Sequence, residues 1–159
     1  MLLGLVLWLP LLACQIPRGV PGAEPLSLSR VAAEGDPARR ASMRLVMGGL
    51  DSDDGGRFAE ASARYQRALQ VDPTNPYAWL ALARQEIFEG DADRGLAHLD
   101  KARALLGSDE SVAAHLAGLR GAGLVAIGQP GLGQPFLEEA RQLAPDVWGD
   151  GTLDASELR

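Results

Sequence analysis

Small residues recur at fixed positions along this 159-residue chain, and this repeat constrains the fold more than any other feature. Aligning Pro73 with Gly107 places two segments in register 34 residues apart, and Pro145 continues the series after four extra residues. We take the units as 42–75, 76–109 and 114–147. Glycine or alanine then occupies positions eight, fifteen, twenty and twenty-seven of every unit: Gly49, Ala83 and Gly121; Gly56, Gly90 and Gly128; Ala61, Gly95 and Gly133; Ala68, Ala102 and Ala140. A period of this length indicates stacked copies of one supersecondary unit.

The placement of the small residues predicts that each unit is a pair of antiparallel helices. Positions eight and twenty would face each other where the helices cross, because small side chains let two backbones approach. Position fifteen would be the turn, where glycine can adopt a positive φ. Asp36-Pro37 and Asn75-Pro76 are helix-start signals, each a capping side chain followed by proline. No stretch alternates in the way of a strand, so an all-α fold is predicted.

These units resemble the tetratricopeptide repeat (TPR). The segment NPYAWLALARQEIFEGDADRGLAHLDKARAL is a nearly complete unit, with Trp79, Ala83, Gly90, Gly95, Leu99 and Ala102 in the family's places. The third unit departs most, since Ala117 stands where Trp79 stood. The resemblance implies an α-α superhelix of about three TPR hairpins over residues 37–147, followed by a capping segment at 148–159. An unrelated helical bundle is the alternative.

In TPR proteins the first helices line a concave groove, and the resemblance implies a protein or peptide partner there. The groove residues it assigns are Met43, Val46, Tyr77, Leu80, Arg84 and His115. This apolar surface with a few polar groups suits an extended or helical peptide, with the Tyr77 ring as its anchor. The alternative is that part of the surface packs on the N-terminal segment or the C-terminus. Trp148, Leu153 and Leu158 are placed to cover the last apolar face of the array.

The beginning of the chain has the features of an export signal. Residues 1–13, MLLGLVLWLPLLA, are uncharged and apolar, and they are too short to cross a bilayer as a helix. Leu11, Leu12, Ala13 and Cys14 resemble the lipobox of bacterial lipoproteins, which implies cleavage before Cys14 and acylation of its thiol. No Lys or Arg precedes the run, as such signals usually have. An ordinary cleaved signal with a chance cysteine is the alternative.

Several properties of the chain suggest where the protein would act. Gln15 follows Cys14 where an inner-membrane lipoprotein commonly has aspartate, so the resemblance implies an outer-membrane anchor facing the periplasm. Residues 14–36 contain three prolines and read as a flexible tether; packing of Leu26, Leu28 and Val31 on the domain is the alternative. The net charge of -6 without a basic stripe argues against a nucleic-acid partner.

The sequence offers little for catalysis or for a metal. His98 and His115 stand in different units, and no nucleophile motif, cofactor-binding loop or paired cysteine is present. Residues 146–157 overlay a calcium loop through Asp146, Asp150, Asp154 and Glu157, but Trp148 stands where an oxygen ligand belongs. A capping box formed by Asp154 and Glu157 is the favoured interpretation. The predicted function is a lipid-anchored envelope TPR module that binds or scaffolds a protein or peptide partner without any cofactor, as part of an assembly machine. A subunit that acts through its edges is the alternative, and an enzyme comes third.

Overall fold

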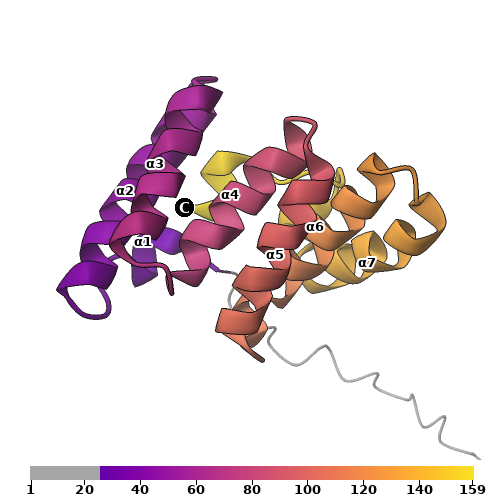
Figure 1. Ribbon diagram of the computed structural model, residues 1–159. Helices are drawn as coiled ribbons and strands as arrows, with labels where there is room; N and C mark the ends of the chain where they lie inside the picture. The colour runs from indigo at the N-terminus through magenta and orange to yellow at the C-terminus, as the bar shows by residue number, and fades with distance from the viewer. Residues whose placement is uncertain (1–25) are drawn as a thin grey trace, which may run out of the picture.

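The computed structural model describes residues 26–159, and this part of the chain is helical throughout, without a β-strand. The main helices form three antiparallel hairpins, α2 with α3, α4 with α5 and α6 with α7, which stack side by side (Figure 1). The predicted all-α superhelix of three hairpins is confirmed. No helix within residues 26–159 is both long and apolar enough to span a bilayer. The elements are α1 Leu28–Val31, α2 Pro37–Asp54, α3 Phe58–Val71, α4 Pro76–Phe88, α5 Ala92–Leu106, η1 Glu110–Val112, α6 Ala113–Ala126, α7 Pro130–Leu143, α8 Pro145–Trp148 and η2 Ala155–Leu158.

Both predicted proline-containing helix starts are capped by side chains. The Asp36 carboxylate accepts the backbone N–H of Arg39 at 2.8 Å, and the Asn75 side-chain oxygen accepts that of Tyr77 at 3.1 Å. Each cap satisfies one of the N–H groups that a helix leaves without a partner at its beginning. The buried Asn75 amide also donates to Ser42 Oγ at 2.8 Å. This hydrogen bond fixes the beginning of α4, in the second hairpin, to α2 in the first.

In the second and third hairpins the small residues at positions eight and twenty lie where the two helices approach closely. An ideal Cβ built on Gly95 would fall 2.9 Å from the Ala83 carbonyl oxygen, and one on Gly133 would fall 2.6 Å from that of Gly121. Real Cβ atoms do not approach a backbone oxygen this closely, so these positions require glycine. The turn glycines at position fifteen, Gly56, Gly90 and Gly128, have φ values of 71°, 99° and 80°. The steric interpretation of the repeat is therefore confirmed at both kinds of position.

The segment before α2 is packed against the hairpins in its described part. Leu26 and Leu28 are buried, and the backbone N–H of Leu26 donates to the Ser111 carbonyl at 3.1 Å. The prediction of a flexible tether is therefore wrong for residues 26–31, because apolar side chains there gain more from burial than a free chain gains in entropy. The rest of the predicted tether before Leu26, with Cys14 and the signal of residues 1–13, lies outside the described residues.

The C-terminal segment, residues 145–159, turns back along the array after α7. Figure 1 shows this yellow segment behind α4, beside helices that are far from it in sequence. Trp148, Leu153 and Leu158 are buried as a cap would be, but they do not cover the outer face of the last helix. On α7 itself Leu132 and Leu143 remain 62% and 53% exposed. The prediction that the C-terminal segment covers the last apolar face is wrong.

Candidate functional site

The C-terminal segment lies in the concave surface formed by α2, α4 and α6. The Trp148 ring packs against Gly118 and meets His115 edge to face, with ring centroids 6.5 Å apart. Farther along, the Leu153 carbonyl accepts a hydrogen bond from Arg84 Nε at 2.6 Å. The 3₁₀ helix η2 then contacts α2, and Arg159 pairs with Asp51 on that helix. The C-terminal segment, residues 145–159, thus touches the first helix of all three hairpins, and we call it the cover.

The six residues predicted to line an open groove are buried or partly buried. Met43, Val46, Leu80 and His115 have no exposed surface, Arg84 is 8% exposed, and Tyr77 is half-buried. The prediction that they present a free binding surface is wrong, and its alternative, packing on the chain's own ends, describes the structure. The physical reason is that an apolar concave surface of this kind is too costly to leave in water when apolar side chains of the same chain can reach it.

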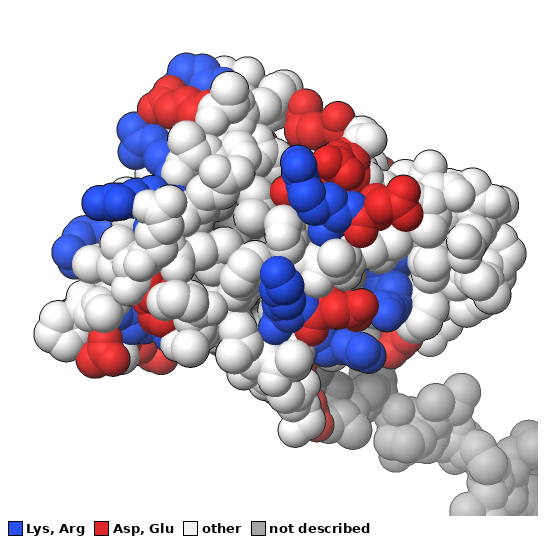
Figure 2. Space-filling model, in the orientation of Figure 1, with Lys and Arg blue, Asp and Glu red and all other residues white. Residues whose placement is uncertain are grey.

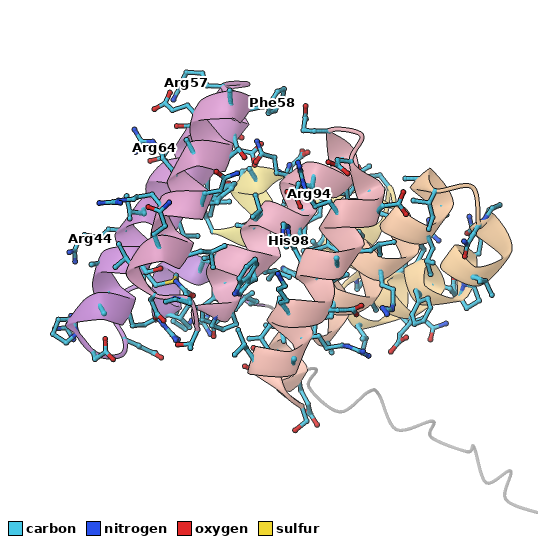
Figure 3. The ribbon with its side chains drawn as sticks, in the orientation of Figure 1. Arg44, Arg57, Phe58, Arg64, Arg94 and His98 are labelled. Carbon is cyan, nitrogen blue, oxygen red and sulfur yellow. The ribbon has the colours of Figure 1, made fainter. Side chains whose placement is uncertain are left out.

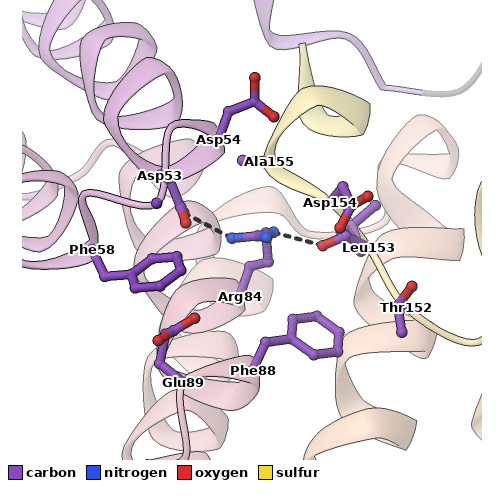
Figure 4. Close-up of a pocket in the computed structure, with 11 residues that line it drawn as sticks. Asp53, Asp54, Phe58, Arg84, Phe88, Glu89, Thr152, Leu153, Asp154 and Ala155 are labelled. Atoms are coloured by element: carbon purple, nitrogen blue, oxygen red, sulfur yellow. Dashed lines mark hydrogen bonds and ion pairs between the residues drawn. The ribbon is translucent and has the colours of Figure 1, made fainter.

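One opening remains beside the cover. It is a pocket of about 420 Å³ at the turn end of the first two hairpins, lined by Asp53, Asp54, Phe58, Arg84, Phe88, Glu89 and residues 152–155 (Figure 4). Asp53 and Asp54 end α2, Phe58 begins α3, and Arg84, Phe88 and Glu89 come from the end of α4. The C-terminal segment supplies the opposite wall. Three separate stretches of the chain, 53–58, 84–89 and 152–155, therefore build this pocket.

Arg84 is held at the back of the pocket by two fixed acceptors. Its Nη1 lies 2.7 Å from Asp53 Oδ2, and its Nε donates to the Leu153 carbonyl, as the dashed lines in Figure 4 mark. The buried Tyr65 hydroxyl donates to the same Asp53 oxygen at 3.1 Å. Burial raises the pKa of Asp53 above its ordinary value, while Arg84 and Tyr65 oppose this by favouring the carboxylate. Burial beside Asp53 also raises the pKa of Tyr65, which keeps its hydroxyl a donor.

The mouth of the pocket combines aromatic rings with carboxylates. Phe58 is 42% exposed, although it is a large apolar side chain at the first position of α3 (Figure 3). Its backbone carbonyl accepts a hydrogen bond from Gln85 Nε2 at 2.6 Å, which fixes this end of α3 against α4. The Arg84 guanidinium lies over the Phe88 ring, 5.8 Å from its centroid. Asp54 and Glu89 are exposed at the rim.

Sequence reasoning missed most of this pocket. It placed Arg84 in the groove, but it did not single out Phe58, Phe88 or Glu89. A signal was available, because Phe58 and Phe88 each stand two residues from a turn glycine, Gly56 or Gly90. Large apolar side chains so close to exposed turns are unusual enough to suggest a surface with a role.

A second opening, of about 260 Å³, lies between the first two hairpins on another face. There Glu86 accepts from Arg94 Nε at 2.7 Å and lies 2.6 Å from His98 Nδ1; Figure 3 labels Arg94 and His98 on α5. The partly buried Trp79 packs against His98 at a centroid distance of 5.1 Å and under the Lys101 ammonium at 4.4 Å. Glu86 on α4 is held by Arg94 and His98 of α5, so the cluster joins these two helices.

His115 is a buried polar residue without a hydrogen-bond partner. Neither of its ring nitrogens has a partner, and the same is true of the neighbouring Trp148 Nε1. Burial lowers the pKa of His115 to about 4, so the ring is neutral at ordinary pH. His115 and Trp148 meet edge to face and contribute packing between α6 and the C-terminal segment.

The weak calcium candidate is not assembled. Asp150 accepts from Thr152 N at 2.9 Å in a turn, while Asp154 and Glu157 form the predicted capping box, in which Glu157 accepts from Asp154 N at 2.7 Å. Asp146 lies apart in the first turn of α8. These groups are occupied with the backbone instead of converging on one point, so the calcium interpretation is wrong and the capping-box interpretation is confirmed. No cluster of three or more potential metal ligands occurs within residues 26–159.

Comparison with known proteins supports the repeat identified in the sequence. The family model described as TPR repeat matches residues 54–84, which span α3 and most of α4. These are the second helix of the first hairpin and the first helix of the second, so the match crosses the junction at which the pocket lies. No curated protein and no solved structure matches the chain.

Proposed function

We propose that this protein is a TPR-type scaffold, held at a bacterial membrane by an acylated Cys14, which binds a protein partner through surfaces outside the filled groove. TPR repeats generally mediate protein–protein interaction, and the match over residues 54–84 supports that general role. The observation that carries the more specific proposal is the cover itself: residues 145–159 already occupy the surface where a peptide would lie. Contact through the edges is therefore favoured over a peptide in the groove.

The charge distribution supports anchoring by acyl chains rather than by electrostatic attraction. Figure 2 shows a row of basic side chains along the left edge, over the first hairpin, and Lys or Arg beside Asp and Glu over the middle of this face. The chain as a whole has a net charge of -6, which opposes electrostatic attraction to anionic lipid headgroups. Stable anchoring then requires acyl chains, and more than one of them. From Cys14 to Leu26 a chain can reach at most about 40 Å, enough to hold the hairpins clear of a bilayer.

The anchor is tested by metabolic labelling with a fatty acid and by membrane fractionation. Cys14 is the only cysteine, so no other thiol can take the label. We expect Cys14→Ser to abolish labelling and to release the protein from outer-membrane fractions. Labelling that survives the substitution would refute the lipid anchor.

The binding mode is tested by crosslinking capture of the partner from envelope membranes, followed by affinity measurements. Tyr77→Ala alters a groove residue, so edge contact predicts unimpaired affinity, with helicity checked by circular dichroism. A loss of about 2 kcal/mol in Tyr77→Ala would instead place the partner in the groove. If no protein is captured by crosslinking, the scaffold proposal itself is refuted.

A partner that displaces the C-terminal segment is the second candidate, and one observation favours it. Three buried ring nitrogens, both of His115 and that of Trp148, lack hydrogen-bond partners under the cover. Each unsatisfied polar group weakens the cover, so a peptide that supplied acceptors and donors there would compete with residues 145–159. The Tyr77→Ala measurement distinguishes the two modes.

A further inference from the structure

The pocket beside the cover carries unbalanced negative charge. Its one cation, Arg84, is neutralised by Asp53 and is further held by the Leu153 carbonyl. Three more carboxylates line the pocket, from Asp54, Glu89 and Asp154. Asp154 is engaged as a helix cap, whereas Asp54 and Glu89 project at the rim, where Figure 4 labels both. The pocket therefore presents at least two carboxylates, of Asp54 and Glu89, for which no ion pair is found within residues 26–159.

The walls of the same pocket are aromatic. Phe58 exposes 42% of its surface, and the Phe88 ring lines the pocket under Arg84. In the view of Figure 4 the Glu89 carboxylate lies below the Phe58 ring and to the left of the Phe88 ring. Aromatic faces carry a negative quadrupole, so they attract cations, and exposed carboxylates beside them add to this attraction.

Other ligand classes fit less well. An anion would be repelled by the carboxylates of Asp54 and Glu89. Two nitrogens of Arg84 already donate hydrogen bonds to acceptors within the protein. A metal ion would need converging oxygen ligands, and no group of three potential ligands occurs among the described residues. A purely apolar ligand would leave the rim carboxylates desolvated without compensation.

We propose that this pocket receives the guanidinium or ammonium group of an arginine or lysine side chain that protrudes from a protein partner. The proposal rests on the function proposed above, since it gives the scaffold's partner a chemical requirement. The pocket volume of about 420 Å³ is in the range of sites that enclose a small ligand. Because residues 152–155 form one wall, a bound side chain would contact the hairpins and the C-terminal segment together, and would hold the cover closed.

The test uses defined peptides and does not require the natural partner. The full chain, kept in mild detergent because of its apolar beginning, is titrated with the peptide Ac-Gly-Leu-Arg-Leu-Gly-amide and followed by two-dimensional NMR. The matched probe has citrulline in place of arginine, which keeps the shape and removes the charge. We expect amide shifts at Phe58, Phe88 and Glu89 with a Kd of about 1–10 mM for one such contact, and about tenfold weaker binding of the citrulline peptide.

Variants locate the site. Glu89→Gln and Asp54→Asn should each weaken binding of the arginine peptide several-fold, as should Phe58→Leu, which keeps an apolar side chain without the ring. Glu110→Gln removes an exposed carboxylate on η1, away from the pocket, and should leave the affinity unchanged. Spectra without peptide confirm that each variant is folded.

Three results would overturn the proposal: equal affinity for the arginine and citrulline peptides, no shifts at the pocket up to about 10 mM peptide, or insensitivity to the Glu89 and Asp54 variants. Ethylguanidinium that binds as tightly as the peptide would also overturn it, by assigning the pocket to a free organic cation. These outcomes concern the pocket alone, whereas failure to capture a partner from membranes concerns the scaffold function.

Discussion

The Trp148 ring lies so close to Gly118 that an ideal Cβ built on the glycine would fall 2.3 Å from Cε2 of the indole. No side chain other than hydrogen fits at position 118 while the cover is in place. The contact joins the C-terminal segment to α6. A single methyl group added at position 118 should therefore loosen the cover.

We expect Gly118→Ala to destabilise the protein by about 1–3 kcal/mol and to loosen Trp148, because the added methyl overpacks a rigid ring. Denaturant unfolding measures the first effect and near-ultraviolet circular dichroism of the indole the second. Gly48→Ala is the control, since its Cβ would meet only the Arg64 guanidinium, which can swing into solvent. The control should be neutral or slightly stabilising, and equal behaviour of the two variants would contradict the contact.

Gly133→Ala should destabilise the third hairpin by about 1–3 kcal/mol, because the new methyl would meet the Gly121 carbonyl oxygen, which is backbone and cannot rotate away. Gly131→Ala lies two residues earlier on the same helix, where a Cβ meets nothing within 4 Å. It should stabilise the protein by up to about 1 kcal/mol through helix propensity. Thermal unfolding of both variants is the measurement, and a Gly133→Ala protein as stable as the wild type would refute the close crossing.

Acid should destabilise the protein through His115. Its pKa is about 4 when folded, against 6.5 for a free side chain, so between these values the unfolded chain binds the extra proton. Stability contributed by the neutral ring is complete above pH 6.5 and falls by about 3 kcal/mol as the pH drops to 4. His115→Leu should remove this part of the slope in urea unfolding at several pH values. The same slope in both proteins would show that His115 does not titrate in this way.

Breaking the buried ion pair of the pocket should be costly. Arg84→Met leaves Asp53 buried without its cation and leaves the Leu153 carbonyl without its donor, so we expect a loss of about 3–5 kcal/mol. Adding Asp53→Asn to Arg84→Met should recover part of that loss, because a neutral amide can still accept from Tyr65. Denaturant midpoints of the two variants decide the matter; a double variant no more stable than Arg84→Met would argue against an uncompensated charge as the cause.

Local sterics allowed much of the fold to be predicted. Gly95 and Gly133 were assigned to crossings, and Gly56, Gly90 and Gly128 to turns, because each of these requirements involves only neighbouring backbone. Asp36 and Asn75 were recognised as caps for the same reason. Glycine positions and helix caps of this kind can be recognised from the local sequence alone.

The occupant of the concave surface could not be predicted in that way. Met43, Val46 and Leu80 are buried, and Trp148, Leu153 and Leu158 are buried as expected. That the C-terminal apolar residues would pack on this inner set depended on contacts across the whole array. The periodicity of the sequence gives no information about such contacts. The pocket was missed for the same reason, since its walls come from three stretches of the chain that meet only after the cover is in place.

The path of the C-terminal segment also bears on how the array comes apart. In a simple row of repeats each hairpin touches only its neighbours, so the end hairpins can fray while the middle persists. Here Trp148, packed against Gly118 of α6, and Arg159, paired with Asp51 of α2, join the two ends of the row. Removing either end hairpin would strip the cover from the other two. The hairpins should therefore unfold together in one all-or-none transition, and hydrogen exchange should find comparable protection in α2 and α6 rather than a gradient along the row.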